Sequence, residues 1–358
     1  MPEIAESSDS MRWMIYGANG YTGELIAREA ARRGHKPLLA GRNRDSVEAL
    51  AKSLELEARV FDLDPASIGD QLKGVGLVLN CAGPFSSTAA PMMEACLAAG
   101  AHYLDITGEI AVFELAQSLN NRAKAAGVVL CPGVGFDVIP TDCVAATLKA
   151  ALPDATHLAL GFDTRSDFSP GTAKTSVEGM AQGGKIRRDG KIVTVPLAYE
   201  VRRIDFGDGE KDAMTIPWGD VSTAFHTTGI PNVKVFIPGS PGMIKSVKRA
   251  NLFRSLLGLK LVQMFLKARI AKTIKGPNED KRARKPSYVW GEAVNAQGVK
   301  RTAQIRTANG YSLTVTGSLA VVEFLMKSRS QGGAYTPSKL VGADLVERLP
   351  GSEKLRVT

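Results

Sequence analysis

Three glycines near the start of the chain have the spacing GxxGxxG. Gly17, Gly20 and Gly23 follow a short apolar run and precede a segment of helical composition. In this context the first glycine permits a tight turn, the second lets the backbone approach a pyrophosphate, and the third allows close packing of helix on strand. Phosphates would bind N–H groups at the N-terminus of the helix. We therefore expect a dinucleotide site, with a structural turn as the alternative. The expected contacts are Gly17, Ala18, Asn19, Gly20, Tyr21, Thr22 and Gly23.

Two arginines, Arg42 and Arg44, follow the next apolar run. An NAD site usually has Asp or Glu at this point, and that carboxylate binds the ribose 2′-hydroxyl. Arginine instead binds a 2′-phosphate with its forked guanidinium. The two arginines therefore favour NADP over NAD, and the alternative is a solvated basic loop.

Two later apolar runs supply further cofactor candidates. Asp62 follows the third run and is expected to hydrogen-bond the adenine amino group. Cys81, Ala82 and Gly83 follow the fourth run, and their small size would let the backbone approach the nicotinamide ribose. The chain has four histidines and four cysteines with neither an HExxH nor a CxxC pair, so we expect no metal site.

Two carboxylates are the candidates for catalysis. Glu109 and Asp137 each precede an expected helix at the carboxyl end of a strand, where doubly wound sheets bind their ligands. One of them would orient the substrate or relay a proton. The alternative for both is stabilisation of a helix N-terminus through the helix dipole.

These residues need a scaffold that brings several strand ends together. From residue 12 onward, short apolar runs alternate with segments rich in Ala, Leu, Glu and Arg. This βαβ alternation predicts a parallel sheet with helices on both faces. Strands are expected at residues 12–16, 37–40, 59–61, 77–80, 103–106 and 128–131, and helices at 23–33, 44–54, 89–99 and 111–125.

The pattern changes near Pro153. Residues 156–237 contain β-branched runs broken by Gly, Pro and Asp, which predicts a largely antiparallel second domain, and helical patterns return after residue 319. The expected fold class is α/β, with an N-terminal Rossmann-type doubly wound parallel sheet and a mixed α/β second domain. We expect an NADP-binding Rossmann domain at 11–150, a substrate and dimerisation domain at 151–315, and a C-terminal segment at 316–358 that packs back on the Rossmann domain.

The net charge of +9 is concentrated in one stretch. No Asp or Glu occurs between Asp220 and Glu279, and this stretch contains the basic, apolar segment 241–275. We expect either a buried or dimer-forming helix, or a surface for an anionic membrane or for an acyl substrate with an anionic carrier. Nucleic acid is excluded as a partner because no recognised binding module or stacking aromatic array accompanies the charge.

The composition is 44% hydrophobic and 23% charged, as in ordinary soluble globular proteins. The first ten residues resemble neither a secretory signal nor a transit peptide, and no apolar run is long enough to span a membrane. The four cysteines are expected to be buried free thiols. We therefore expect a cytoplasmic protein, with peripheral membrane contact as an added feature.

Several motifs together resemble the saccharopine dehydrogenase-like oxidoreductases, in particular the branch that contains the mycobacterial trans-acting enoyl reductase. The motifs are GANGYTG (17–23), LAGR (39–42), NCAGPF (80–85), HYLDITGE (102–109), PGVGFDVIPTD (132–142), SPGTAKTS (169–176), GPNEDKRAR (276–284) and GGAYTP (332–337). The resemblance implies a Rossmann domain, an inserted mixed α/β domain, a C-terminal segment returning to the first domain, and frequent dimerisation.

The leading hypothesis is an NADP(H)-dependent oxidoreductase that transfers hydride to an acyl, lipid-type or other hydrophobic substrate. One alternative is an imine or amino-acid dehydrogenase similar to saccharopine reductase, whose polar, carboxylated substrate needs convergent Arg or Lys side chains. Another is a non-catalytic, membrane-associated NADP-binding protein, which would lack an organised acid near the nicotinamide.

Overall fold

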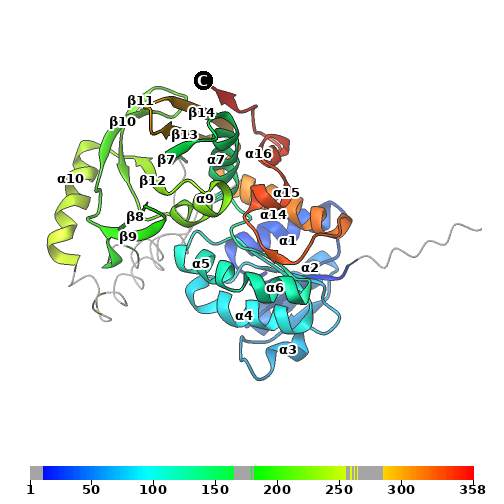
Figure 1. The fold of residues 1–358 in the computed structure, drawn as a ribbon. Helices are drawn as coiled ribbons and strands as arrows, with labels where there is room; N and C mark the ends of the chain where they lie inside the picture. The colour runs from blue at the N-terminus through cyan, green and yellow to red at the C-terminus, as the bar shows by residue number, and fades with distance from the viewer. Residues whose placement is uncertain are drawn as a thin grey trace, which may run out of the picture.

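The computed structural model describes residues 11–164, 179, 181–254, 259, 262, 264 and 285–358. These residues form two sheets, each with its own helices (Figure 1). No helix in these ranges is long and apolar enough to cross a membrane.

The first sheet, sheet A, has seven parallel strands in the order β15-β6-β5-β4-β1-β2-β3. Its strands are β1 (Trp13–Tyr16), β2 (Leu38–Gly41), β3 (Ala58–Val60), β4 (Leu77–Asn80), β5 (His102–Asp105), β6 (Val129–Cys131) and β15 (Gly333–Ala334). The strand order reverses between β1 and β4, and ligands bind beyond the carboxyl ends of the strands at such a point. The predicted doubly wound parallel sheet is confirmed.

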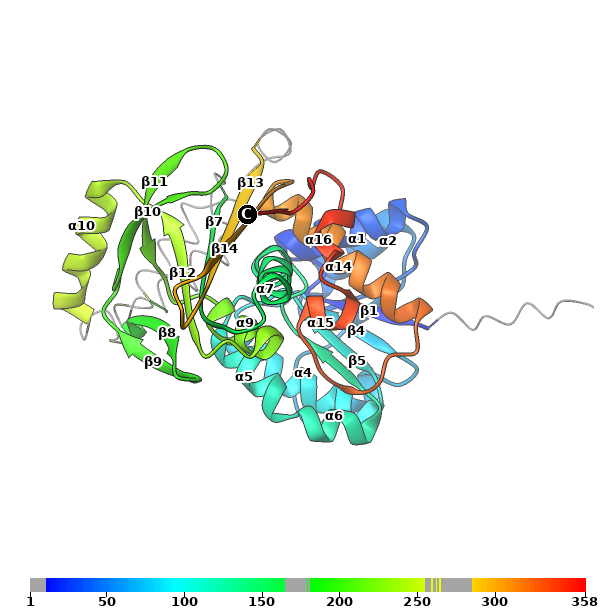
Figure 2. The same ribbon diagram turned by 45° about the horizontal axis from the view of Figure 1, so that its top comes forward.

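Helices cover both faces of sheet A (Figure 2). Trp13 and Ile15 of β1 point to one face, whereas Met14 and Tyr16 point to the other, so both sets are buried. This two-sided burial explains why the strands are continuous apolar runs. The first face is covered by α1 (Tyr21–Arg32), α2 (Arg44–Leu54) and α14 (Gly310–Lys327), and the second by α3 (Ile68–Gln71), α4 (Phe85–Ala99), α5 (Ile110–Ser118) and α6 (Asn120–Ala126).

The second sheet, sheet B, is mixed and largely antiparallel, as the sequence predicts. Its main path is β10-β11-β12-β7-β13-β14-β16, and β8 pairs with both β12 and β9. Among the described strands of sheet B, the β12–β7 pair is parallel and every other pair is antiparallel. The strands are β7 (Ala155–Asp163), β8 (Gly184–Arg188), β9 (Lys191–Val195), β10 (Val201–Asp205), β11 (Glu210–Thr215), β12 (Asn232–Pro238), β13 (Ser287–Asn295), β14 (Lys300–Thr307) and β16 (Arg356–Val357).

Helix α7 (Ile139–Ala151) connects the two sheets but packs on sheet B. A Cβ on Gly291 of β13 would lie 2.5 Å from Val144 Cγ1 and 2.7 Å from Leu148 Cδ1, so a glycine is needed for this close approach. The other elements beside sheet B are α9 (Asp220–Thr228), α10 (Pro241–Ala250), η1 (Asn251–Phe253), α15 (Pro337–Val341) and α16 (Leu345–Arg348).

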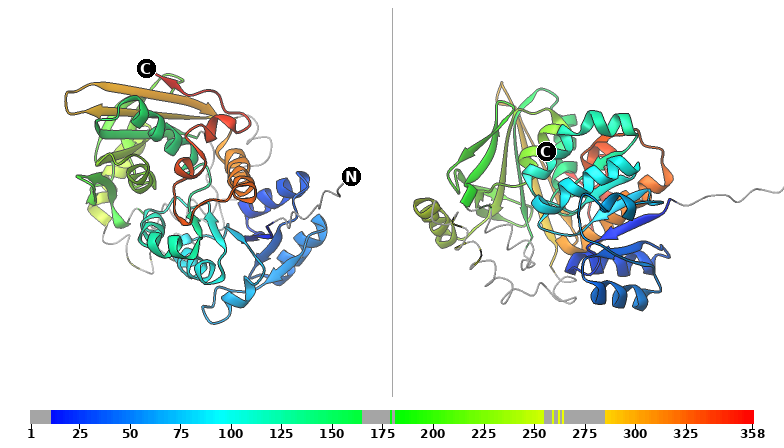
Figure 3. Two further views of the ribbon diagram at one scale, coloured as in Figure 1. Left: turned by 45° about the vertical axis from the view of Figure 1, so that its right-hand side comes forward. Right: turned by 90° about the horizontal axis from the view of Figure 1, so that it is seen from below.

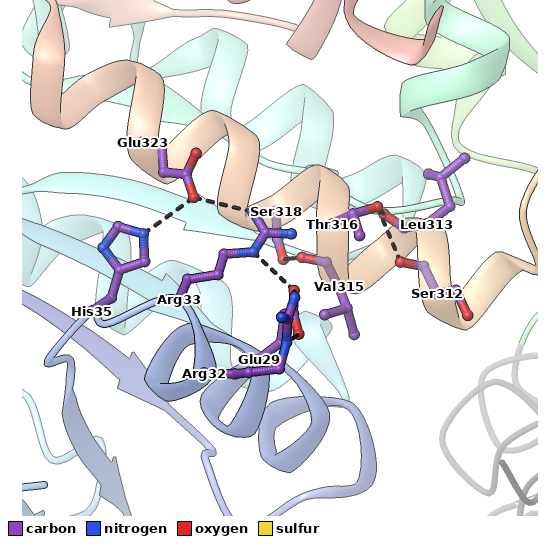
Figure 4. Close-up of polar contacts among 10 residues, drawn as sticks. All are labelled: Glu29, Arg32, Arg33, His35, Ser312, Leu313, Val315, Thr316, Ser318 and Glu323. Carbon is purple, nitrogen blue, oxygen red and sulfur yellow. Dashed lines mark hydrogen bonds and ion pairs between the residues drawn. The ribbon is translucent and has the colours of Figure 1, made fainter. Parts of the chain in front are cut away.

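The C-terminal segment contributes to both sheets. Strand β15 pairs with β6 of sheet A, whereas β16 pairs with β14 of sheet B. Helix α14 is held on α1 by Arg33, which bonds Glu29 at 2.9 Å and Glu323 at 3.0 Å, and His35 lies 3.1 Å from Glu323 (Figure 4). The segment therefore joins the two sheets rather than returning to sheet A alone.

Candidate functional site

Two of the three motif glycines are required by the fold itself. Gly17 has φ +79°, and a Cβ on it would lie 2.7 Å from the backbone nitrogen of Ala82. A Cβ on Gly23 would lie 2.3 Å from the carbonyl oxygen of Gly17. The turn after β1 is further held by hydrogen bonds from the N–H groups of Gly17 and Ala18 to the Ala40 carbonyl, at 2.8 and 3.1 Å. The turn thus contacts the ends of both β2 and β4.

Gly20 is different, because the fold constrains it less. Its φ is −80°, which any residue adopts, and the nearest atom to an added Cβ is the Gly17 carbonyl oxygen at 3.3 Å. Gly20 is the N-cap residue of α1, and no side chain caps this helix. An uncapped N-terminus without a Cβ over it is the arrangement that accepts a pyrophosphate.

The end of β2 places the two arginines differently. Arg42 is exposed and makes no ion pair within the described ranges. Arg44 is the first residue of α2, and its Nη1 lies 2.8 Å from Glu48 Oε1. Arg42 is therefore the better placed of the two to bind a 2′-phosphate.

Asp62 lies near Arg42. Both act on the buried Tyr16, whose pKa is raised to about 12 by burial, while Arg42 lowers it and Asp62 raises it. Gly41 is a site residue that the sequence analysis did not select, because its role depends on a contact across strands. A Cβ on Gly41 would lie 2.9 Å from Asn19 Oδ1, so this glycine makes room for the Asn19 side chain.

The loop after β4 is fixed by hydrogen bonds. The Cys81 N–H donates to the Tyr16 carbonyl at 2.7 Å, and the Ala82 N–H donates to Asn80 Oδ1 at 3.0 Å. Thr88 Oγ1 donates to the Ala82 carbonyl at 2.6 Å. Burial raises the pKa of the Cys81 thiol, so it stays neutral and is a poor nucleophile. Cys81, Ala82 and Gly83 therefore present a fixed backbone beside the glycine turn.

Glu109 caps a helix, but not the helix that it precedes. Its two carboxylate oxygens accept the N–H groups of Phe85 at 3.0 Å and Ser86 at 2.8 Å, at the start of α4. The N-cap residue of α4 is Pro84, whose side chain makes no cap hydrogen bond. This geometry favours the helix-dipole alternative for Glu109 and makes it a positioning residue for the loop after β4.

Asp137 has the opposite environment. It lies in the loop between β6 and α7, and burial raises the pKa of its carboxyl to about 7. Its carboxylate makes no hydrogen bond to another described residue, although its carbonyl accepts Trp218 Nε1 at 3.0 Å. A Cβ on Gly108 would lie 3.1 Å from Asp137 Oδ2, so the loop after β5 passes close to this carboxyl. A half-buried acid that titrates near neutrality is suited to proton transfer.

A third carboxyl, Asp105, ends β5 and organises the same region. It is fully buried and accepts Tyr103 Oη at 2.7 Å and the N–H groups of Thr107 and Gly133 at 3.0 and 2.9 Å. Burial raises its pKa to about 6. Asp105 lies at a strand end in HYLDITGE, which is a sequence signal, but the sequence analysis does not predict a site role for it.

Two buried acids join α7, α9 and α15 behind Asp137. Asp142 accepts Thr227 Oγ1 and, at 2.8 Å, the Ser338 N–H. Asp220 accepts Thr141 Oγ1 at 2.6 Å, and burial raises its pKa well above the ordinary value. Neither was selected from the sequence, since their partners are 79 or more residues away in the chain.

Some expected features lie outside the described residues. They include the whole of the motifs at 169–176 and 276–284, together with most of segment 241–275 after Arg254. Among the described residues, no group of three or more His, Cys, Asp or Glu side chains is placed to hold a metal ion.

Comparisons with known proteins identify the nucleotide-binding part. Residues 13–131 match the family described as the saccharopine dehydrogenase NADP binding domain. A human saccharopine dehydrogenase-like oxidoreductase is 31% identical over 150 residues, covering 36% of this chain and 35% of that protein. A candidate trans-acting enoyl reductase of Mycobacterium tuberculosis is 31% identical over 138 residues, covering 36% of this chain and 33% of that protein. Residues 13–131 are therefore similar to the NADP-binding domain of the saccharopine dehydrogenase-like oxidoreductases. The matched region spans only about a third of these relatives' own lengths.

The solved structure of yeast saccharopine dehydrogenase (L-Glu forming), in its apo form, shares the fold of this chain. The TM-score is 0.62 at 11% identity, with 97% of this chain and 100% of the yeast chain covered. The predicted resemblance to saccharopine dehydrogenase-like oxidoreductases and the predicted cofactor, NADP(H), are confirmed.

The described residues fit NADP(H). The N-terminus of α1 has no side-chain cap and no Cβ at its N-cap residue, Gly20, and exposed Arg42 follows β2 where a 2′-phosphate binds in such domains. The fixed backbone at Cys81–Gly83 lies beside the turn, on the nicotinamide side of the strand-order reversal.

Proposed function

We propose that the protein is an NADP(H)-dependent oxidoreductase that reduces a hydrophobic or acyl-type substrate, with Asp137 as the proton donor. The observation that carries the proposal is the half-buried Asp137 carboxyl, which has no hydrogen-bonding partner among the described residues and a pKa of about 7. A group in this state holds a proton near neutral pH and can release it to a reacting atom.

Each residue of the site has a defined part in this reaction. When bound, NADPH supplies the hydride. The glycine turn and Arg42 hold the phosphates, and Glu109 keeps the loop after β4 in place through the start of α4. Asp137 delivers its proton to the atom beside the carbon that has accepted the hydride. Trp218 bonds the Asp137 carbonyl and fixes its backbone.

The surroundings of Asp137 support an apolar substrate. Phe136 and Phe162 lie 5.8 Å apart, and Phe162 and Trp218 lie 5.1 Å apart, measured between ring centroids. No Arg or Lys in the described part of the chain contributes to the pKa shift of Asp137, which burial alone causes. A dicarboxylic imine substrate would need cations at this point. The enoyl reductase relative is compatible with an acyl substrate.

The cytoplasm is the compartment we propose. All four cysteines are free and three of them are buried, as suits a reducing environment. Cell fractionation with an antibody to the chain tests this assignment, and recovery in an organelle would overturn it.

The test of function compares two substrate classes with the same enzyme. Consumption of NADPH is followed with a medium-chain 2-enoyl thioester and with a cyclic imino acid. We expect the thioester to be reduced, and Asp137→Asn to slow turnover by roughly 10²–10⁴-fold while leaving NADPH affinity nearly unchanged.

Two other results of this experiment would favour the alternative functions. Preferential reduction of the imino acid would favour a saccharopine-reductase-like dehydrogenase. Tight NADPH binding with no consumption on either substrate would favour a non-catalytic NADP-binding protein.

A further inference from the structure

Helix α10 and the short helix η1 carry a surface that the proposed function does not use. The helix is attached to sheet B by Ile244, which is buried with Ala198 and Met214. Ser240 caps its N-terminus by accepting the Met243 N–H at 3.2 Å. The remaining side chains mostly point outward. We define the α10 face as Lys245, Lys248, Arg249, Leu252 and Phe253.

The apolar members of the α10 face are strongly exposed. Leu252 is 79% exposed and Phe253 57%. Isolated exposed apolar residues are ordinary, but two large neighbours beside exposed cations at the C-terminal end of a helix form a patch that marks an interaction site. Tyr199 and Val201, which are also exposed, lie on the adjoining strand region.

The cations share a face with Leu252. Counted from Lys245, the other two cations follow after three residues (Lys248) and four residues (Arg249), and Leu252 follows after seven. Residues with these spacings lie on one side of a helix. None of the three cations makes an ion pair with another described residue. They line an open groove of about 550 Å³ together with Val201, Ile244 and Leu252, in which Asp212 is the one acidic residue among the lining side chains.

The α10 face lies away from the proposed cofactor site on sheet A. Figures 1 and 3 show α10 at the outer edge of sheet B, on the side away from sheet A. A large partner on this face would therefore not cover the glycine turn or the strand ends of sheet A.

We propose that the α10 face binds the surface of an anionic membrane. The three cations would contact lipid phosphates, and Leu252 and Phe253 would enter the boundary between headgroups and acyl chains. Charge complementarity selects this partner, because three cations outnumber the single acid, Asp212, that lines the groove, and the stretch from residue 221 to residue 278 contains no Asp or Glu. The proposal is independent of the chemistry at Asp137.

The experiment uses the full chain with phosphatidylcholine vesicles, made with and without phosphatidylglycerol, in a flotation assay. We expect binding to the anionic vesicles only, and weaker binding as salt is raised. Lys245→Glu combined with Arg249→Glu should lower the apparent affinity by about tenfold or more. Leu252→Ala combined with Phe253→Ala should also lower it, and this loss should persist at high salt.

A matched control is Lys36→Glu combined with Lys339→Glu, which makes the same charge change at exposed positions away from α10. It should keep most of the binding, and all variants should keep the thermal midpoint of the wild type. Equal binding to both vesicle types, no binding at low salt, or an equal loss in the control would overturn the proposal. A concentration-dependent dimer that Leu252→Ala with Phe253→Ala dissociates would instead assign the face to a second copy of the chain.

Discussion

At the residue scale, Asp137 gives the reaction a pH dependence. Burial raises its pKa from the ordinary 3.8 to about 7, so its carboxyl is protonated below that pH. A reduction that uses the acid form should be fast below pH 7 and decline above it. The pH profile of NADPH oxidation at saturating substrate checks this, and the decline should disappear in Asp137→Asn. A profile that keeps its decline in this variant would assign the proton to another group, such as Asp105.

The two arginines after β2 give a second prediction at this scale. Arg42→Ala should weaken NADPH binding by roughly ten- to a hundredfold and leave NADH binding nearly unchanged, since only NADPH has the 2′-phosphate. Arg44→Ala is the matched control and should have a smaller effect, because Glu48 already bonds its guanidinium. Fluorescence titration of each variant with NADPH and with NADH measures the affinities. Equal losses in the two variants would mean that both arginines bind the phosphate.

The sequence was informative about backbone requirements and less so about side-chain partners. The tight turn expected at Gly17 and the close packing expected at Gly23 agree with the positive φ of Gly17 and with the contact of Gly23 with the Gly17 carbonyl, both of which are local features. Glu109 and Asp137 looked equivalent, each an acid before a helix. Their carboxyl groups differ in what the fold places against them: the N–H groups of Phe85 and Ser86 for Glu109, and no hydrogen-bond donor among the described residues for the Asp137 carboxyl.

At the element scale, the turn between β1 and α1 contains one glycine that the fold requires and another that we expect cofactor binding to require. Gly23→Ala places a Cβ 2.3 Å from a backbone oxygen, so α1 must shift, and we expect a loss of about 1–3 kcal/mol in the free energy of unfolding. Gly20→Ala meets its nearest atom at 3.3 Å and should fold with little loss, yet weaken NADPH binding about tenfold by crowding the pyrophosphate. Urea unfolding without cofactor, and NADPH titration, measure the two effects. A Gly20→Ala variant with unchanged affinity would place the phosphates elsewhere.

The boundaries of the elements were predicted best where the determinants are local. The strand expected at 77–80 matches β4, and the helix expected at 44–54 matches α2. The side chain of Asn43 caps α2 by accepting the Ser46 N–H, a contact between residues only three positions apart. Helix α4 begins at Phe85, four residues earlier than expected, because Glu109 accepts its first N–H groups from a loop 23 and 24 residues away. The expected helix at 111–125 is divided into α5 and α6 at Leu119.

At the scale of the whole molecule, one cluster of side chains joins the two sheets beside the site. Glu114 of α5 accepts Ser222 Oγ of α9 at 2.5 Å and Arg187 Nη2 of β8 at 2.7 Å, and His226 Nε2 lies 3.3 Å away. Arg187 is 4% exposed and also lies over the Phe225 ring at 4.3 Å. None of these pairings follows from local sequence patterns, since the residues are 73 or more positions apart from Glu114.

This cluster makes the joint between the sheets sensitive to acid. The hydrogen bond with His226, together with Ser222 and Arg187, holds the pKa of Glu114 at about 2, below its ordinary 4.5. A carboxyl whose pKa is lower in the folded state stabilises the fold above pH 4.5 and loses that contribution as the pH falls toward 2. Glu114→Gln should therefore lower the urea midpoint at pH 7, and its difference from the wild type should narrow at pH 3. Glu94→Gln is the matched control, because Glu94 bonds Arg122 at 2.7 Å between two helices on the same face of sheet A. If the control loses as much stability as Glu114→Gln, the joint between the sheets depends on contacts other than Glu114, such as the bonds of Asp142 to Thr227 and Ser338.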